Sequence, residues 1–93
     1  MGKVKVVFSE YALFEMRRRG IEKGSVKEVV ERPQQQIPSR NNKIILQSKY
    51  LDSLQNKEML LRVIGRRTRE EFFIITVYKT SRIEKYWQKE IIE

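Results

Sequence analysis

The second half of the sequence consists of strand-like segments joined by short polar turns, and this pattern restricts the fold more than any other feature. Residues 43–50, 58–66 and 71–80 are rich in β-branched, aliphatic and aromatic residues. An Arg- and Glu-rich turn joins the last two segments and predicts a hairpin. Because consecutive strands with short connections pair antiparallel, this half of the chain predicts an antiparallel sheet.

The first half predicts one strand and two helices. Residues 3–8 alternate charge and valine before becoming apolar, which favours a strand. Ser9 is placed to cap a helix, and a run of arginines followed by Gly20 is typical of a helix end. Ser25 opens a capping-box pattern, so we expect a second helix from there to the residues before Pro33.

The remaining segments predict an edge strand, a turn, a loop and a short helix. Residues 34–39 are polar and contain Pro38, so they form an edge strand at most. Residues 40–42 predict a tight turn and residues 51–57 a loop. Thr80 or Ser81 is placed to cap a last helix that reaches Ile91. Residues 1–93 therefore predict one α+β domain: strand, helix, helix, a sheet of three or four antiparallel strands, and a short C-terminal helix, with the two early helices covering one sheet face.

The charge balance indicates a polyanionic partner. Twenty Lys and Arg oppose twelve Asp and Glu, and the net charge of +8 is divided evenly between residues 1–40 and 41–93. Such an excess favours binding to phosphate-rich molecules, RNA above all.

The absence of two residue types narrows the chemistry further. The chain has no Cys and no His, which excludes disulfides, thiolate metal sites and imidazole catalysis, and we expect neither a metal nor a cofactor. Its longest apolar stretches have the length of strands and no signal peptide is evident, so we expect no membrane association and a cytoplasmic location.

Several short motifs, in order and spacing, resemble those of a known family. They are Phe8-Ser9-Glu10-Tyr11-Ala12, Met16, Arg19-Gly20-Ile21, Val26, Val29, Pro33, Leu61-Arg62-Val63-Ile64, Thr76-Val77-Tyr78-Lys79-Thr80-Ser81-Arg82 and Lys85-Tyr86-Trp87. Together they resemble a domain-of-unknown-function family (DUF4258-like) related to the RelE/ParE toxin superfamily, over nearly the whole chain from Val4 to Trp87. The family often has His where this chain has Tyr11, so any role of that imidazole is absent here.

The resemblance implies a RelE/ParE-like fold and the toxin component of a type II toxin–antitoxin system. It implies metal-independent cleavage of messenger RNA, often on the ribosome, and a cognate antitoxin protein that holds the toxin inactive. In ParE-like relatives the target is DNA gyrase instead. Two other interpretations remain open from the sequence. In one, the protein binds RNA or gyrase without cutting; in the other, its basic surface meets only an acidic protein.

Cleavage without a metal requires three groups. One takes the proton of the 2′-hydroxyl, one stabilises the phosphoryl oxygens, and one protonates the leaving 5′-oxygen. Arg62 interrupts an apolar strand, where it shares a side with Leu60 and Ile64. It is either a phosphate ligand on the sheet or a solvent-facing or ion-paired side chain.

The other candidates are assigned by order in the resemblance or by charge. Arg82 and Tyr86 match an arginine and a tyrosine of the toxins. Lys49 and Lys57 flank the loop before the Arg62 strand, and each is a candidate base or an ordinary surface lysine. Trp87 is expected to anchor the C-terminal segment to the core. Candidate nucleic-acid-binding residues are Arg17, Arg18, Lys57, Arg66, Arg67, Tyr78, Lys79 and Lys85.

Overall fold

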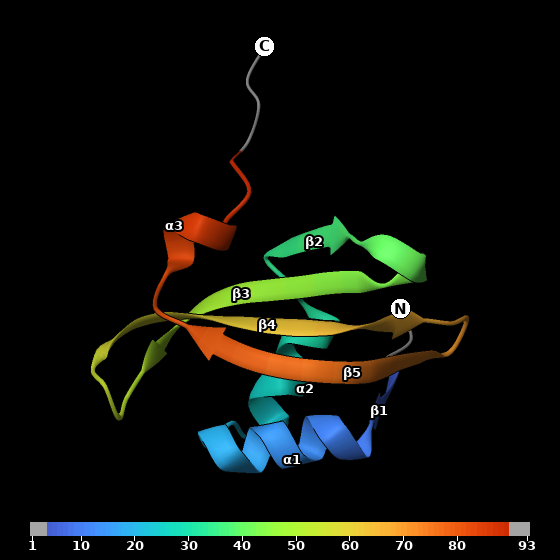
Figure 1. The fold of residues 1–93 in the computed structure, drawn as a ribbon, viewed down its shortest axis with the longest axis horizontal. Helices are drawn as coiled ribbons and strands as arrows, with labels where there is room; N and C mark the ends of the chain where they lie inside the picture. The colour runs from blue at the N-terminus through green and yellow to red at the C-terminus, as the bar shows by residue number, and fades with distance from the viewer. Residues whose placement is uncertain (1–3, 90–93) are drawn as a thin grey trace.

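The computed structural model describes residues 4–89, which form five strands, two longer helices and two short helical segments (Figure 1). In chain order the elements are β1 (Lys5–Phe8), α1 (Glu10–Arg19), α2 (Lys23–Glu31), β2 (Gln35–Pro38), the 3-10 turn η1 (Arg40–Asn42), β3 (Ile44–Asp52), β4 (Lys57–Arg67), β5 (Glu71–Thr80) and α3 (Ile83–Tyr86). The predicted α+β class is confirmed, and so is the edge position of the strand that contains Pro38.

The five strands form one mixed sheet in the order β1-β5-β4-β3-β2. The four strands from β2 to β5 pair antiparallel, as the short connections predict. β1 instead pairs parallel with β5, from Lys5 opposite Glu71 to Phe8 opposite Ile74. The N-terminal strand therefore joins the sheet beside the last strand, and α1 and α2 lie in the connection that follows it.

One face of the sheet carries the hydrophobic core. Leu46, Val63 and Val77 lie opposite one another across β3, β4 and β5, and all three are fully buried. They pack against the apolar faces of α1 and α2, which contribute Ala12, Met16, Val26, Val29 and Val30. Figure 1 shows these two helices on one side of the central strands and α3 on the other. The expectation that the early helices cover one face is confirmed.

The ends of α1 are set by local sequence. The Ser9 hydroxyl accepts a hydrogen bond from the Ala12 N–H at 2.9 Å, which satisfies one of the unpaired donors of the first turn. Gly20 has φ 68°, and the following Ile21 N–H donates to the Met16 carbonyl at 2.8 Å. These bonds reverse the chain and bring it directly to α2.

Two predicted helix starts are wrong. α2 begins at Lys23 with Glu22 as its N-cap, so Ser25 lies inside the helix and not at its start. The close turn after Gly20 already supplies an extended residue at Glu22, and the chain becomes helical at once. α3 has Arg82 as its N-cap, without a side-chain capping bond, in place of Thr80 or Ser81. The extension of that helix to Ile91 lies outside the described residues.

A β-bulge separates the two halves of the β4–β5 pair. Ile64 lies opposite Thr76, but the next residue, Gly65, lies opposite Ile74, so Ile75 is the extra residue. The Ser9 hydroxyl donates a hydrogen bond to the Ile75 carbonyl at 3.0 Å. The same serine that caps α1 therefore also supplies a hydrogen-bond donor to the carbonyl of the bulged residue.

Candidate nucleic-acid interface

Four polar side chains form a row across the sheet on the face opposite the core. The strand register places Gln35 beside Gln47, Gln47 beside Arg62, and Arg62 beside Tyr78, on β2, β3, β4 and β5 in turn. Directly opposed residues in a sheet point to the same face, and the neighbours of this row, such as Val63, point into the core. The row therefore lies beneath α3.

Arg62 is the centre of this row. Its Nε donates to Gln47 Oε1 at 2.8 Å and its Nη1 donates to the Tyr78 hydroxyl. The guanidinium carbon lies 4.2 Å from the centroid of the Tyr86 ring, and Arg62 is only 7% exposed. Among residues 4–89, no carboxylate lies within ion-pairing distance of it. A buried positive charge is thus surrounded by neutral dipoles and an aromatic face, an arrangement that attracts an anion.

Two glutamines fasten α3 over Arg62. Gln47 Nε2 donates to Gln35 Oε1 at 2.8 Å and to the Tyr86 carbonyl at 3.1 Å. Gln35 in turn donates to the Gln88 carbonyl at 2.6 Å and accepts from the Gln88 N–H at 2.9 Å. Sequence reasoning missed both residues. The one available signal is that Gln47 lies within an apolar strand, two residues from Lys49 on the same face.

Aromatic rings and lysines surround this centre. The rings of Tyr78 and Tyr86 meet edge to face, with centroids 6.2 Å apart. Lys49 Nζ lies 4.1 Å from the centroid of the Trp87 ring, and Lys85 Nζ lies 5.4 Å from that of Tyr86. Cations beside half-buried aromatic rings suit a single nucleic-acid strand, because bases stack on rings while ammonium groups hold phosphates.

The structure brings several of the predicted residues together. Arg62, Tyr86 and Lys49 share the face beneath and beside α3, and Tyr78 and Lys85 join them. Arg82 precedes α3, where its N–H donates to the Thr80 hydroxyl at 3.0 Å and the residue is exposed. Trp87 is half-buried and contacts Lys49, and it is not among the residues that pack against the hydrophobic core on the helix side.

Other predicted nucleic-acid-binding residues lie elsewhere. Arg17 and Arg18 belong to the last turn of α1, where Arg18 pairs with the buried Glu15 at 2.8 Å. Lys79 points to the helix side and forms an ion pair with Asp52 at 3.2 Å. Lys57 begins β4, and the exposed Arg66 and Arg67 end it.

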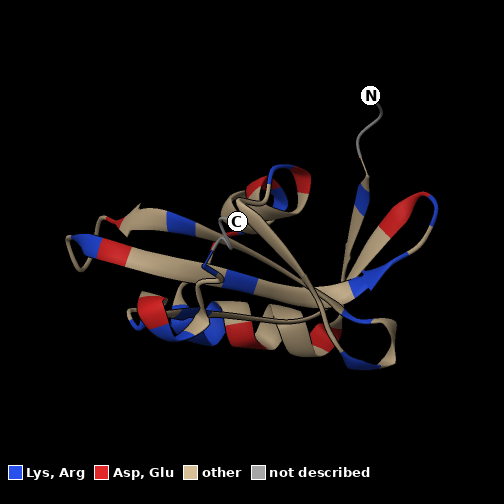
Figure 2. Ribbon diagram, turned by 90° about the horizontal axis from the view of Figure 1, so that it is seen from above, with Lys and Arg blue, Asp and Glu red and all other residues tan. Residues whose placement is uncertain are grey.

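The charge excess belongs to the sheet and α3. Residues 33–89 contain twelve Lys and Arg against five Asp and Glu, an excess of +7. Residues 10–32, which span α1 and α2, contain six against five, an excess of +1. Figure 2 shows the mixture of acidic and basic positions along the helical segments. A polyanion is therefore attracted to the sheet and α3 more than to the helical layer.

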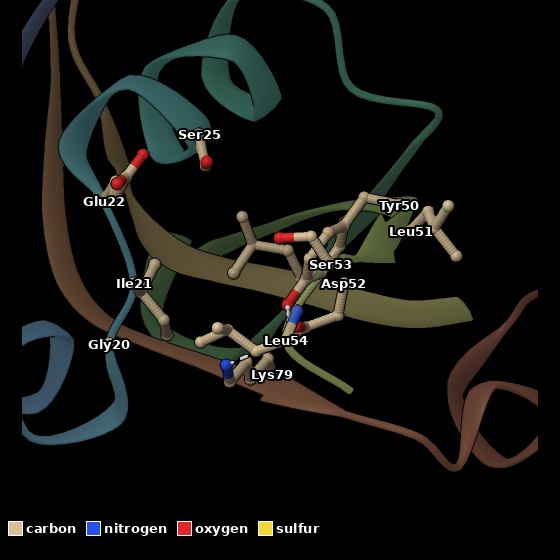
Figure 3. Close-up of a pocket in the computed structure, with 11 residues that line it drawn as sticks. Gly20, Ile21, Glu22, Ser25, Tyr50, Leu51, Asp52, Ser53, Leu54 and Lys79 are labelled. Atoms are coloured by element: carbon tan, nitrogen blue, oxygen red, sulfur yellow. Dashed lines mark hydrogen bonds and ion pairs between the residues drawn. The ribbon is translucent and has the colours of Figure 1, made fainter. Parts of the chain in front are cut away.

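A second concave site lies on the helix side, at the end of the sheet beside the β3–β4 turn (Figure 3). Its volume is about 340 Å³, and its polar floor is formed by Asp52 and Lys79. The hydrogen bond from Lys79 is the main cause that lowers the pKa of Asp52, helped by the N–H groups of Gln55 and Leu54. Burial, with the nearby Asp52 charge, raises the pKa of Tyr50 to about 12. Asp52 and Lys79 neutralise each other, as in a structural ion pair.

Comparison of the chain with protein-family models, curated proteins and solved structures finds no match in any of the three. Within residues 4–89 no helix has the length and apolar character needed to cross a membrane. The same part of the chain contains no group of three or more metal-binding side chains.

Proposed function

We propose that this protein is a metal-independent endoribonuclease of the toxin type, which binds single-stranded RNA on the α3 face of its sheet. The observation that carries the proposal is the buried, unneutralised guanidinium of Arg62 at the centre of a basic and aromatic surface. A phosphate is the anion that RNA supplies, and the fork of an arginine matches two of its oxygens. The resemblance to toxins supports the same assignment.

Access to Arg62 requires that Tyr86 move. The Tyr86 ring covers the guanidinium, and the backbone around it is held by the side chains of Gln47 and Gln35. The Gln47 bond reaches the last residue of α3, and the Gln35 bond reaches Gln88 beyond it. The proposal therefore requires only that the Tyr86 ring turn away while these backbone bonds stay in place. In the proposed complex, the entering strand takes the place of the ring over Arg62, and the freed phenol comes to lie beside the scissile phosphate.

The proposed reaction assigns one group to each step. Lys49 is the proposed base that takes the proton of the 2′-hydroxyl as the 2′-oxygen attacks the phosphorus. Arg62, with Arg82 approaching from the α3 N-cap, stabilises the added charge on the phosphoryl oxygens. The bond to the 5′-oxygen breaks as that oxygen takes a proton from the Tyr86 phenol. The products are a 2′,3′-cyclic phosphate and a 5′-hydroxyl, and no metal or cofactor takes part.

The test is incubation of the purified protein with a defined messenger RNA in chelator, with and without ribosomes. The proposal expects chelator-resistant fragments with cyclic phosphate ends, and loss of cleavage in Arg62→Lys and Tyr86→Phe. Lys27→Ala is the matched control, because it removes one exposed charge from the helical layer. Intact RNA with every protein, with and without ribosomes, would refute cleavage.

A second candidate function is RNA binding without cleavage. It is favoured by the 7% exposure of Arg62, whose Nε and Nη1 already have neutral partners. In that case Arg62 organises the sheet face, and Lys49, Lys85 and Trp87 make the contacts. Salt-sensitive binding with no fragments, equal in wild type and Tyr86→Phe, would identify this alternative.

A further inference from the structure

The structure carries one inference about which base the RNA-binding face selects. We propose that the pocket between α3 and β3 binds a single unpaired guanine, with Glu84 as the residue that determines the specificity. The inference rests on the proposed function, because it names a base within the RNA that the α3 face binds. It arises from Glu84, an acidic side chain in a pocket whose other charged groups are lysines.

The pocket has the size and walls of a base-binding site. Its volume is about 280 Å³, and it is lined by Lys49, Ile83, Glu84, Trp87 and Lys89. Binding cavities for larger small molecules run from roughly 300 Å³ upward, so this pocket suits one base and not a whole nucleotide. Trp87 and Ile83 supply an aromatic and an aliphatic wall, with Lys49 Nζ over one face of the Trp87 ring at 4.1 Å from its centroid, and the two lysines offer positive charge to the phosphates that flank a bound base.

Glu84 is the exception in this pocket. It is exposed, and among residues 4–89 it forms no ion pair, although two lysines line the same pocket. Its charge repels the phosphates that the surrounding cations attract. An ionised carboxylate only accepts hydrogen bonds, and it accepts two parallel bonds from a suitable donor pair. The pocket therefore offers an aromatic wall together with a two-oxygen acceptor.

Guanine is the base that matches this acceptor. Its Watson–Crick edge presents two adjacent donors, the N1–H and the N2 amino group. Adenine and cytosine each present one amino donor beside a ring nitrogen acceptor, and uracil presents one N–H between two carbonyls. A carboxylate meets at least one repelling lone pair on each of those three bases. Recognition of splayed single-stranded bases through this edge, with stacking on an aromatic ring, is a common mode for RNA.

The test is the affinity for U-rich hexaribonucleotides that carry one central G, inosine, A or C, measured by fluorescence anisotropy at fixed salt. We expect the G oligonucleotide to bind roughly tenfold more tightly than those with A or C, the discrimination that a bidentate pair provides. Inosine keeps N1–H but lacks the amino group, so its affinity should fall between them. Trp87 is the only tryptophan, so quenching of the intrinsic fluorescence reports stacking at this pocket.

The variant Glu84→Gln should bind the G and A oligonucleotides almost equally, because it loses the second acceptor. Glu70→Gln removes the same charge at the β4–β5 turn and should keep the preference for G. The deciding quantity is the ratio of the affinity for the G oligonucleotide to that for the A oligonucleotide. A purely structural role of Glu84 would change the affinities for all oligonucleotides by the same factor and leave this ratio unchanged. Persistence of the G preference in Glu84→Gln would overturn the inference.

Two further outcomes separate this inference from the function on which it rests. Equal affinities of the wild type for all four oligonucleotides, with Trp87 quenched, would overturn guanine selection while RNA binding stands. Absence of binding to any of them would overturn both proposals.

Discussion

Arg62 and Tyr78 lie directly opposite each other on β4 and β5, and the Arg62 guanidinium donates a hydrogen bond to the Tyr78 hydroxyl. Gln47 holds the guanidinium from the other neighbouring strand at 2.8 Å. The positive charge is thus fixed by two strands and covered by Tyr86 from a third element. This relationship couples the stability of the sheet to the geometry of the proposed site.

The Arg62–Tyr78 pair should be measurable by a double-mutant cycle. Tyr78→Phe should lower the free energy of unfolding by about 1–3 kcal/mol, because it leaves one buried charged donor without its partner. In the background of Arg62→Met the same change should cost much less, which gives a coupling energy of about 1 kcal/mol or more. Urea unfolding monitored by circular dichroism checks both values. Tyr11→Phe, at an exposed position, is the control, and a coupling energy near zero would show that the bond contributes nothing.

Gly65→Ala should destabilise the fold strongly. A Cβ at this position would lie 2.2 Å from the Phe73 carbonyl oxygen and 2.7 Å from the Phe72 ring, so the bulged strands must separate to admit it. We expect a loss of about 3 kcal/mol, at the upper end for overpacking. Gly24→Ala is the matched control, because a Cβ there meets nothing within 4 Å and Gly24 lies inside α2. That change should stabilise by about 0.5–1 kcal/mol. Thermal unfolding of the two variants should therefore shift in opposite directions.

The Asp52–Lys79 ion pair should make stability depend on pH in the acid range. The pKa of Asp52 is lowered in the folded protein, chiefly by the Lys79 hydrogen bond, relative to an ordinary value of about 4. The ionised Asp52 carboxylate therefore contributes fully to the free energy of unfolding at pH values above the ordinary pKa of Asp. This contribution is lost as the pH falls through the lowered pKa of the folded protein. Asp52→Asn keeps an acceptor for the Leu54 and Gln55 N–H groups but loses the charge. The difference in unfolding free energy between wild type and variant should shrink as the pH falls, and a pH-independent difference would contradict this.

Local features of the fold were predictable from sequence because their causes are local. The hydroxyl of Ser9 and the missing side chain of Gly20 act within one helical turn, and both caps are confirmed. The β4–β5 hairpin follows from alternation and a short turn. The start of α2 was not predictable from the Ser25 motif, because the bond between Ile21 and Met16 places Glu22 in cap geometry first.

Long-range features were not predictable from one sequence. The parallel pairing of β1 with β5 joins residues more than sixty positions apart, and no local signal specifies it. Arg62 was identifiable as a charge in an apolar strand, but its partners were not. Gln47 and Gln35 become part of the site only when the register of three strands is known. The same register separates Lys79 from Tyr78, adjacent in sequence but on opposite faces.

The salt dependence of RNA affinity should locate the binding face without reference to cleavage. A single strand that contacts about four phosphates gives a slope near −3 in a plot of log affinity against log salt, because each neutralised phosphate contributes about −0.7. Lys49→Gln should reduce the magnitude of this slope by about 0.7, since it removes one cation beside α3. Lys27→Gln, on the exposed side of α2, should leave the slope unchanged. Equal changes of the slope in the two variants would mean that the helical layer also binds RNA. A change in Lys27→Gln alone would show that RNA binds the helix-covered face of the sheet and not the α3 face.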